Sequence, residues 1–358
     1  MPSLKEIKGR INSISSTLAI TSAMKMVAAA KLQKAQMAIQ NMLPYERRLH
    51  SMLIDLMGAM NISAAASEDG SVRGSGSAER GFDQSGDRLS LSNRHDLAGM
   101  DGAYSLMAQR EVRKVAIVAF ASNSSLCGAF NSNAIREATA VINEYRASGL
   151  RDSDIVVYSV GRKMAEAMKK LGFPSPADFT KMSDSPSYEA ASALAQELLD
   201  GFVSGRFDKV ELVYNHYKST SSQPTTRQTY LPLSLADATA DLQAGKITDS
   251  ASESDTNRGA EPVGAPVVRQ GSPTTEDLIV EPSKEALIAT LLPKVIRLRI
   301  FTTLLDSAAA EQAARTVAMQ LATDNGNDLL QELTLEYNKG RQQKITSEIL
   351  DLVGGSMQ

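Results

Sequence analysis

The chain has 358 residues, of which 42% are apolar and 5% aromatic, and a formal net charge of −3. This length allows two or three domains, and the scarcity of aromatic side chains favours long helices with aliphatic seams over one large globular core. The small net charge argues against a general polyanion binder. Cys127 is the only cysteine, which excludes an intramolecular disulfide and a zinc site built on thiolates. We therefore expect a soluble protein of a reducing compartment.

Residues 1–60 have the pattern of one long helix. Counting in alternate steps of three and four from Leu4 to Met60 gives seventeen positions, of which fourteen are apolar. At 1.5 Å per residue such a helix reaches roughly 85 Å. A rod this long needs a partner along its seam, and the other end of the chain is the obvious candidate. We interpret the polar interruptions at Thr21 and Lys25 as places where the rod faces something other than that partner.

The charge of this first helix is uneven. Residues 1–60 carry eight Lys and Arg against three acidic residues. A basic rod is a candidate for an acidic protein surface or for nucleic acid, and the alternative is a solvated helix face.

A Ser/Gly/Asp-rich stretch at 61–109 is predicted to be an insertion, and an α/β domain follows at 110–236. Short apolar runs predict buried strands, and amphipathic stretches between them predict helices. The strands are expected at 115–120, 155–160, 210–214 and, as an edge strand containing Pro232, 229–233; the helices are expected at 132–147, 162–171 and 188–203. This alternation predicts a Rossmann-like parallel sheet covered by helices.

A second low-complexity insertion is predicted at 237–277, and the chain is then helical over 278–358. Strong helix formers fill this last segment, and Gly354-Gly355 ends it. A helix of some 70 residues is about 100 Å long, comparable with the first helix. The sequence therefore predicts an antiparallel two-helix coiled coil made from both termini, with the α/β domain between them.

Motifs for nucleotide chemistry are weak. Gly245-Lys246-Ile247-Thr248 resembles the end of a phosphate loop, but it lacks the first glycine and has Ile where Ser or Thr belongs. No Gly-x-Gly-x-x-Gly follows a predicted strand, and the closely spaced glycines of the first insertion are low-complexity sequence. We expect no cofactor.

Isolated polar residues have alternative interpretations. The three histidines, His50, His95 and His216, are expected to be solvated or hydrogen-bonded to neighbouring groups rather than to bind a metal. Cys127 follows the first strand, where α/β enzymes keep catalytic groups, but a small buried residue is the preferred interpretation. Asp324 and Asp328 are interpreted as surface charges rather than paired catalytic carboxylates.

Three segments resemble the gamma subunit of F-type ATP synthases. They are Ile20–Lys31 (ITSAMKMVAAAK), Ala309–Gly326 (AAEQAARTVAM, then ATDNG) and Tyr337–Ile349 (YNKGRQQKITSEI). Leu126-Cys127-Gly128 after the first strand adds a fourth match. The family usually has Asp, a basic residue and Gly just before it, whereas this chain has Asn123, Ser124 and Ser125 and so lacks those two charges.

The resemblance implies a non-catalytic rotor shaft that couples ion flow to ATP synthesis or hydrolysis. Its implied partners are the alpha and beta subunits of the catalytic head, the epsilon subunit and the membrane rotor c-ring, with no nucleic acid and no membrane span of its own. Its implied location is the cytoplasmic face of a bacterial inner membrane, peripheral through the complex.

The resemblance also implies subunit contacts. Met24, Lys25, Met26 and Lys31 fall in the bearing region, and Arg341, Gln342 and Thr346 fall in the catch region against the catalytic subunits; helix packing or a solvated face is the alternative for each. Two other functions remain open. One is a coiled-coil scaffold unrelated to ATPases that carries an α/β binding domain, and the other is an α/β nucleotide-binding enzyme with helical arms.

Overall fold

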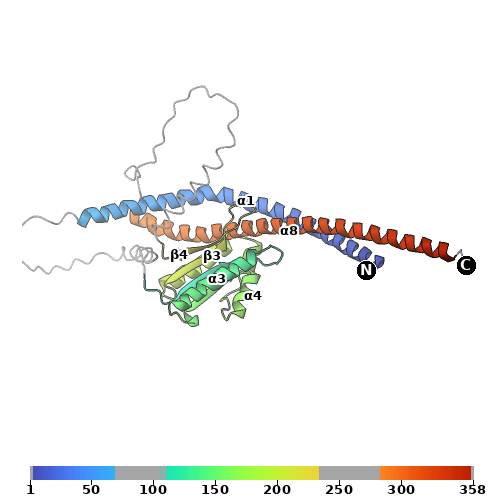
Figure 1. Cartoon of the computed structure of the whole chain (residues 1–358). Coiled ribbons are helices and arrows are strands. Elements are labelled where there is room, and N and C mark those ends of the chain that lie inside the picture. The colour runs from blue at the N-terminus through green and yellow to red at the C-terminus, as the bar shows by residue number, and fades with distance from the viewer. Residues whose placement is uncertain (1–2, 69–105, 107–109, 234–282, 356–358) are drawn as a thin grey trace, which may run out of the picture.

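The computed structural model describes residues 3–68, 106, 110–233 and 283–355. Two helices of great length, α1 and α8, lie side by side, and a small α/β domain is mounted against them (Figure 1). The elements in chain order are α1 (Leu4–Glu68), β1 (Val115–Phe120), α3 (Phe130–Ala147), the 3-10 turn η2 (Asp152–Asp154), β2 (Ile155–Val160), α4 (Arg162–Lys170), α5 (Thr180–Asp184), α6 (Tyr188–Val203), β3 (Lys209–Asn215), β4 (Thr225–Leu231) and α8 (Lys284–Gly355).

The predicted antiparallel pair of terminal helices is confirmed. Thr21 on α1 lies opposite Thr323 on α8, whereas Glu46, further along α1, lies opposite Thr302. Both chain ends therefore lie toward the same end of the rod (Figure 1). Helix α1 continues eight residues beyond the predicted end at 60, because Ala64, Ala65 and Ala66 are strong helix formers. The rest of the first insertion and all of the second lie outside the described residues.

The sheet is mixed, with strand order β2-β1-β3-β4. Strands β1, β2 and β3 are parallel, and β4 pairs antiparallel with β3. The central strand β1 is buried along its whole length, as its continuous apolar sequence predicts. The predicted edge strand begins four residues early and ends before Pro232. Its first half, Thr-Thr-Arg-Gln, has no apolar pattern and is held by backbone pairing with β3.

Two apolar cores lie on opposite faces of the sheet. Helices α3 and α4 cover one face with a core that includes Val141 and Met164. Helices α6 and α8 cover the other face with a larger core that includes Leu198 and Ile296. Leu53 of α1 reaches into this second core, so the domain rests on both long helices. Burial of these aliphatic side chains is the main force that fixes the domain to the rod.

Helix ends follow local signals. Ser187 accepts a hydrogen bond from the Ala190 amide at 3.3 Å and starts α6, and Ser283 accepts one from the Ala286 amide at 3.1 Å and starts α8. The short helix α5 and the turn η2 carry no periodic apolar signal, and the sequence did not predict them.

Candidate functional site

The seam between the long helices uses the heptad positions of α1. Every described seam position from Leu4 to Leu56 is buried or half-buried, while most positions between them are exposed. The Thr323 hydroxyl donates to the Thr21 hydroxyl at 3.1 Å, and the Thr302 hydroxyl donates to the Glu46 carboxylate at 3.0 Å. The interpretation that Thr21 faces away from the partner helix was therefore wrong. Two of the three polar seam positions, Thr21 and Glu46, thus make cross-helix hydrogen bonds, which fix the register of the pair as polar residues do in coiled coils. The third, Lys25, is half-buried, and that it faces a surface other than the partner helix stays a prediction.

The residues expected in the bearing region lie on the outside of the rod. Met24 is 39% exposed and Met26 is 65% exposed, Lys31 is also exposed, and Lys25 is half-buried. Ile20, at 57%, extends this apolar surface one turn toward the N-terminus. Exposed aliphatic side chains that follow one another on a helix are typical of a surface that meets another chain. The flexible Met side chains suit a partner whose shape changes.

The residues expected in the catch region lie on a part of α8 that has passed its partner helix. Gly340 lies against Leu4, the first residue of α1: a Cβ at Gly340 would meet Leu4 Cδ2 at 3.1 Å. Residues 341–355 therefore extend past α1. Arg341, Gln342 and Thr346 are all exposed, and the Thr346 hydroxyl donates only within its own helix, to the Gln342 carbonyl at 2.9 Å.

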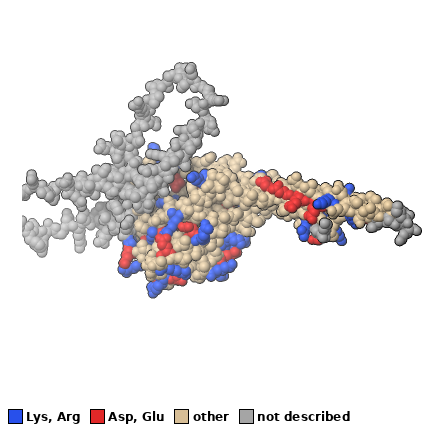
Figure 2. Space-filling model, viewed as in Figure 1, with Lys and Arg blue, Asp and Glu red and all other residues tan. Residues whose placement is uncertain are grey.

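This end of α8, residues 341–355, also exposes aliphatic side chains between its charged residues. Figure 2 shows uncharged surface on this part of the rod just before the grey end. Its exposed aliphatic side chains are Ile345, Ile349, Leu350, Leu352 and Val353. The bearing and catch groups do not form one site. Arg341 is eighteen residues beyond Thr323, which lies opposite Thr21, so the two groups are roughly 27 Å apart along the rod.

Acidic side chains form a stripe on α8 where the rod leaves the domain (Figure 2). Asp324, Asp328, Glu332 and Glu336 are four residues apart and exposed. Asp324 accepts two hydrogen bonds from the Gln320 amide, at 2.8 and 2.9 Å. Asp324 and Asp328 are surface charges, as interpreted from the sequence. They point along a helix face rather than into a cleft.

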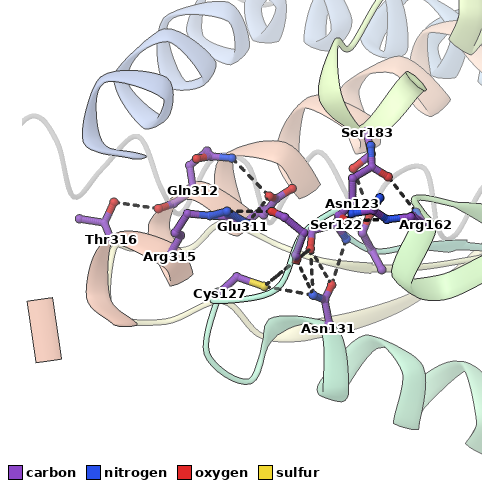
Figure 3. Close-up of polar contacts among 12 residues, drawn as sticks. Ser122, Asn123, Cys127, Asn131, Arg162, Ser183, Glu311, Gln312, Arg315 and Thr316 are labelled. Carbon is purple, nitrogen blue, oxygen red and sulfur yellow. Dashed lines mark hydrogen bonds and ion pairs between the residues drawn. The ribbon is translucent and has the colours of Figure 1, made fainter. Parts of the chain in front are cut away.

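Helix α8 also covers the carboxyl edge of the parallel strands, where α/β proteins of this kind place ligands. Arg315 of α8 donates to the Ser124 hydroxyl at 3.0 Å and to the Glu311 carboxylate at 2.7 Å (Figure 3). Glu311 is buried, and burial raises its pKa although Arg315 opposes that shift. The cavity left between Glu311, Ser183 and the ends of β1 and β2 is about 10 Å³, room for about one water molecule.

The loop after β1 is held by its own polar side chains. Asn131 accepts from the Ser122 amide at 3.0 Å and donates to the Cys127 sulfur at 3.1 Å (Figure 3). Cys127 is buried between Phe130 and α8, as a small core residue. Asn123 accepts from the Arg162 amide at 2.8 Å and donates to the Thr180 carbonyl at 2.7 Å. Asn123 therefore joins the loop to α4 and α5 through hydrogen bonds of its neutral amide.

Two further candidates from the sequence are the histidines and the segment that resembles a phosphate loop. His50 is buried on α1, and His95 lies outside the described residues, as does Gly245–Thr248. Within the described residues no group of three or more His, Cys, Asp or Glu side chains is placed to hold a metal ion. Likewise, none of the described helices has the length and apolarity needed to cross a membrane.

His216 ties the β3–β4 hairpin to α8 and should make stability depend on pH. Its Nδ1 lies 2.6 Å from Asp306 Oδ2, and this hydrogen bond raises the pKa of His216, although burial and Lys218 oppose it. A folded-state pKa above the unfolded value contributes stability below the unfolded pKa and loses it as pH rises through the folded pKa. We expect wild type to have a higher melting temperature than His216→Gln near about pH 6, and the difference in melting temperature to shrink toward about pH 9. A melting-temperature difference that does not change with pH would contradict the ion pair.

Comparison with known proteins identifies the family. The ATP synthase family model matches residues 3–357. The ATP synthase gamma chain of Phocaeicola vulgatus is 46% identical over 357 residues, and that of Bacteroides thetaiotaomicron is 44% identical over 358; each alignment covers 100% of both chains. The rotor of the Euglena gracilis mitochondrial ATP synthase superposes with a TM-score of 0.49 at 18% identity, covering 96% of this chain and 98% of that one.

The chain therefore belongs to the ATP synthase family, and the relatives that match it over its full length are ATP synthase gamma chains. Because the alignment with the Phocaeicola vulgatus chain covers both chains completely, the insertions predicted at 61–109 and 237–277 have counterparts in that relative.

Proposed function

We propose that this chain is the rotor shaft of a proton-translocating ATP synthase and carries no catalytic site of its own. Its free end, residues 341–355 of α8 with their exposed aliphatic side chains, turns inside the hollow of a hexamer of alpha and beta subunits. The α/β domain sits at the opposite end, on the c-ring and beside the epsilon subunit, at the cytoplasmic face of a bacterial membrane. Rotation of the asymmetric shaft changes each catalytic site in turn and so couples proton flow to ATP synthesis or hydrolysis.

The observation that carries this proposal is the row of exposed aliphatic side chains where α8 extends past α1. Ile345, Ile349 and Leu352 are 44%, 53% and 74% exposed, and a group of exposed apolar side chains on one segment is typical of a surface that binds another protein. A ring of surrounding subunits provides a surface that covers these side chains. The cross-helix hydrogen bonds of the seam help the helix pair to resist twisting. Helix α8 fills the carboxyl edge of the sheet, which argues against the nucleotide-binding enzyme.

Isolation of the native complex through a tag on this chain tests the proposal. We expect the chain to bring down a Mg-dependent ATPase, and calorimetry of the isolated chain with ATP to give no binding heat. A coiled-coil scaffold would purify without ATPase activity, and a nucleotide-binding enzyme would bind ATP alone. Either result would overturn the rotor function.

Charge reversal at the free end should disturb the assembled enzyme. Arg341→Glu is expected to lower ATP hydrolysis by the complex about tenfold. Reversing the charge of a side chain that passes each catalytic subunit in turn changes the free energy of their interaction by about 1.4 kcal/mol. The same substitution should leave the melting temperature of the isolated chain unchanged, since Arg341 is exposed. Arg136→Glu on the outer face of α3 is the matched control and should keep wild-type hydrolysis. Equal rates for the two variants would remove Arg341 from the mechanism.

A further inference from the structure

Tyr217, in the hairpin between β3 and β4, bonds to both long helices at once. Its hydroxyl accepts a hydrogen bond from Gln36 Nε2 of α1 at 2.7 Å. Its backbone amide donates to Asp306 Oδ1 of α8 at 2.9 Å. The hairpin belongs to the α/β domain, so one residue connects three bodies that are far apart in the sequence.

The ring of Tyr217 packs where two separate apolar clusters meet. One cluster joins the domain to α8 and contains Cys127, Phe130, Ala310 and Ala314. The other joins α1 to α8 and contains Leu32, Ala309 and Ala313. The alanines leave room for the ring between the helices, because a larger side chain at these positions would occupy that space. Tyr217 therefore fills the junction as well as bonding across it.

The hairpin that carries Tyr217 is internally braced. At its base, buried Asn215 donates to the Phe130 carbonyl at 3.1 Å and accepts from the Thr225 hydroxyl at 2.7 Å. At its tip, Gln223 Nε2 donates to the Ser219 carbonyl at 2.9 Å. A hairpin tied at base and tip moves with the sheet, so a displacement of the domain reaches Tyr217 without being absorbed by the loop.

The position of this junction along α1 gives it a mechanical role. Leu49 and Leu53 of α1 pack into the main core of the domain, whereas Gln36 is thirteen residues closer to the free end, which is about 20 Å. Two attachments this far apart stop α1 from pivoting about the first one. The second attachment lies beside the part of the shaft that leaves the domain.

We infer that Tyr217 is a positioning residue that locks the α/β domain to both shaft helices, so that rotation of the domain reaches the free end without slippage. This inference rests on the proposed rotor function and deepens it. Gln36 holds the tyrosine from α1, and Asp306 holds its backbone from α8. Loss of the lock lets the helices turn partly relative to the domain, so the enzyme hydrolyses ATP while it moves fewer protons.

The test is the coupling ratio in inverted membrane vesicles that contain the whole complex. ATP-driven acidification is divided by the ATP hydrolysis rate for wild type, Tyr217→Ala, Tyr217→Phe and Gln36→Leu. Because both rates come from the same vesicles, the ratio does not depend on how much complex assembles. Thr220→Ala is the control, because the Thr220 side chain is exposed at the tip of the same hairpin.

We expect Tyr217→Ala to lower the ratio about fivefold, the size of the effect that loss of one buried hydrogen bond has on an equilibrium. Tyr217→Phe and Gln36→Leu, which each remove only the bond to α1, should give a smaller decrease of the same sign, and Thr220→Ala none. Tyr217→Phe keeps the ring, so it tests the lock even where Tyr217→Ala fails to assemble. A wild-type ratio in Tyr217→Phe and Gln36→Leu would overturn the inference, whereas wild-type vesicles without ATP-driven acidification would overturn the rotor function itself.

Discussion

Gly161→Ala is expected to destabilise the α/β domain by more than about 4 kcal/mol, the range reserved for backbone clashes in a core. Gly161 ends β2 with φ +99°, a conformation that L side chains rarely adopt. A Cβ there would lie 2.0 Å from the Ala121 carbonyl oxygen and 2.8 Å from its carbon. These atoms belong to the backbone that follows β1, where the Ala121 amide donates to the Val160 carbonyl at 2.9 Å, so they cannot move without breaking the sheet.

Gly172→Ala is the matched control for this substitution. Gly172 has φ +92°, but no atom lies within 4 Å of its ideal Cβ position. Gly172→Ala should therefore lower the free energy of unfolding only by the backbone strain, about 1–2 kcal/mol. Urea denaturation of the two variants, followed by far-UV circular dichroism, separates strain from steric clash. Equal losses of unfolding free energy would contradict the close approach of the two strand ends.

Periodic elements were predictable because one physical signal dominates each of them. Val115–Phe120 and Ile155–Val160 have the bounds expected from their sequences, since both are continuous apolar runs in the interior of the sheet. Helix α6, at Tyr188–Val203, also has its predicted bounds, set by the Ser187 cap and a regular apolar stripe. Strand β4 was mispredicted because backbone pairing with β3, rather than side-chain pattern, forms its first half.

The candidate surfaces were predictable only in part. Family motifs located Met24 and Arg341, and the structure places both at the surface. Their relation to the alpha and beta subunits remains a proposal. The junction at Tyr217 was not predictable, because its partners Gln36 and Asp306 are 181 and 89 residues away in the sequence. Thr21 illustrates the same limit. A polar residue at a heptad position is interpreted as facing away from the partner helix until its hydrogen-bond partner, here Thr323, is known.

Glu211→Ala is expected to destabilise the α/β domain by about 3–5 kcal/mol, because it removes the acidic centre of a buried ionic network. Glu211 on β3 is 1% exposed. It accepts from the Tyr145 hydroxyl at 2.6 Å and from Arg227 at 2.7 Å, and it pairs with Lys209 at 2.6 Å. Without the carboxylate, Lys209 and the Tyr145 hydroxyl lose this acidic partner, and Arg227 keeps only its exposed pair with Glu144.

Glu144 provides the matched control, because it also pairs with Arg227 but has a side chain that is 61% exposed. Glu144→Gln should cost less than about 1 kcal/mol, since solvent replaces the interaction. Urea denaturation near neutral pH measures both variants. If Glu211→Ala costs no more than Glu144→Gln, the network adds nothing to the stability of the domain beyond a surface pair.

The same network sets a direction for the pH dependence of stability. Burial raises the pKa of Glu211, but the hydrogen bonds from Arg227, Lys209 and Tyr145 outweigh it and the net pKa is lowered. A depressed folded-state pKa contributes stability above the unfolded value and loses it as pH falls through the folded value. The difference in unfolding free energy between wild type and Glu211→Gln should therefore be largest near neutral pH and shrink in acid. A difference that grows in acid would mean that the carboxyl group is protonated in the folded domain, and that the hairpin is joined to α3 by neutral hydrogen bonds rather than by charge.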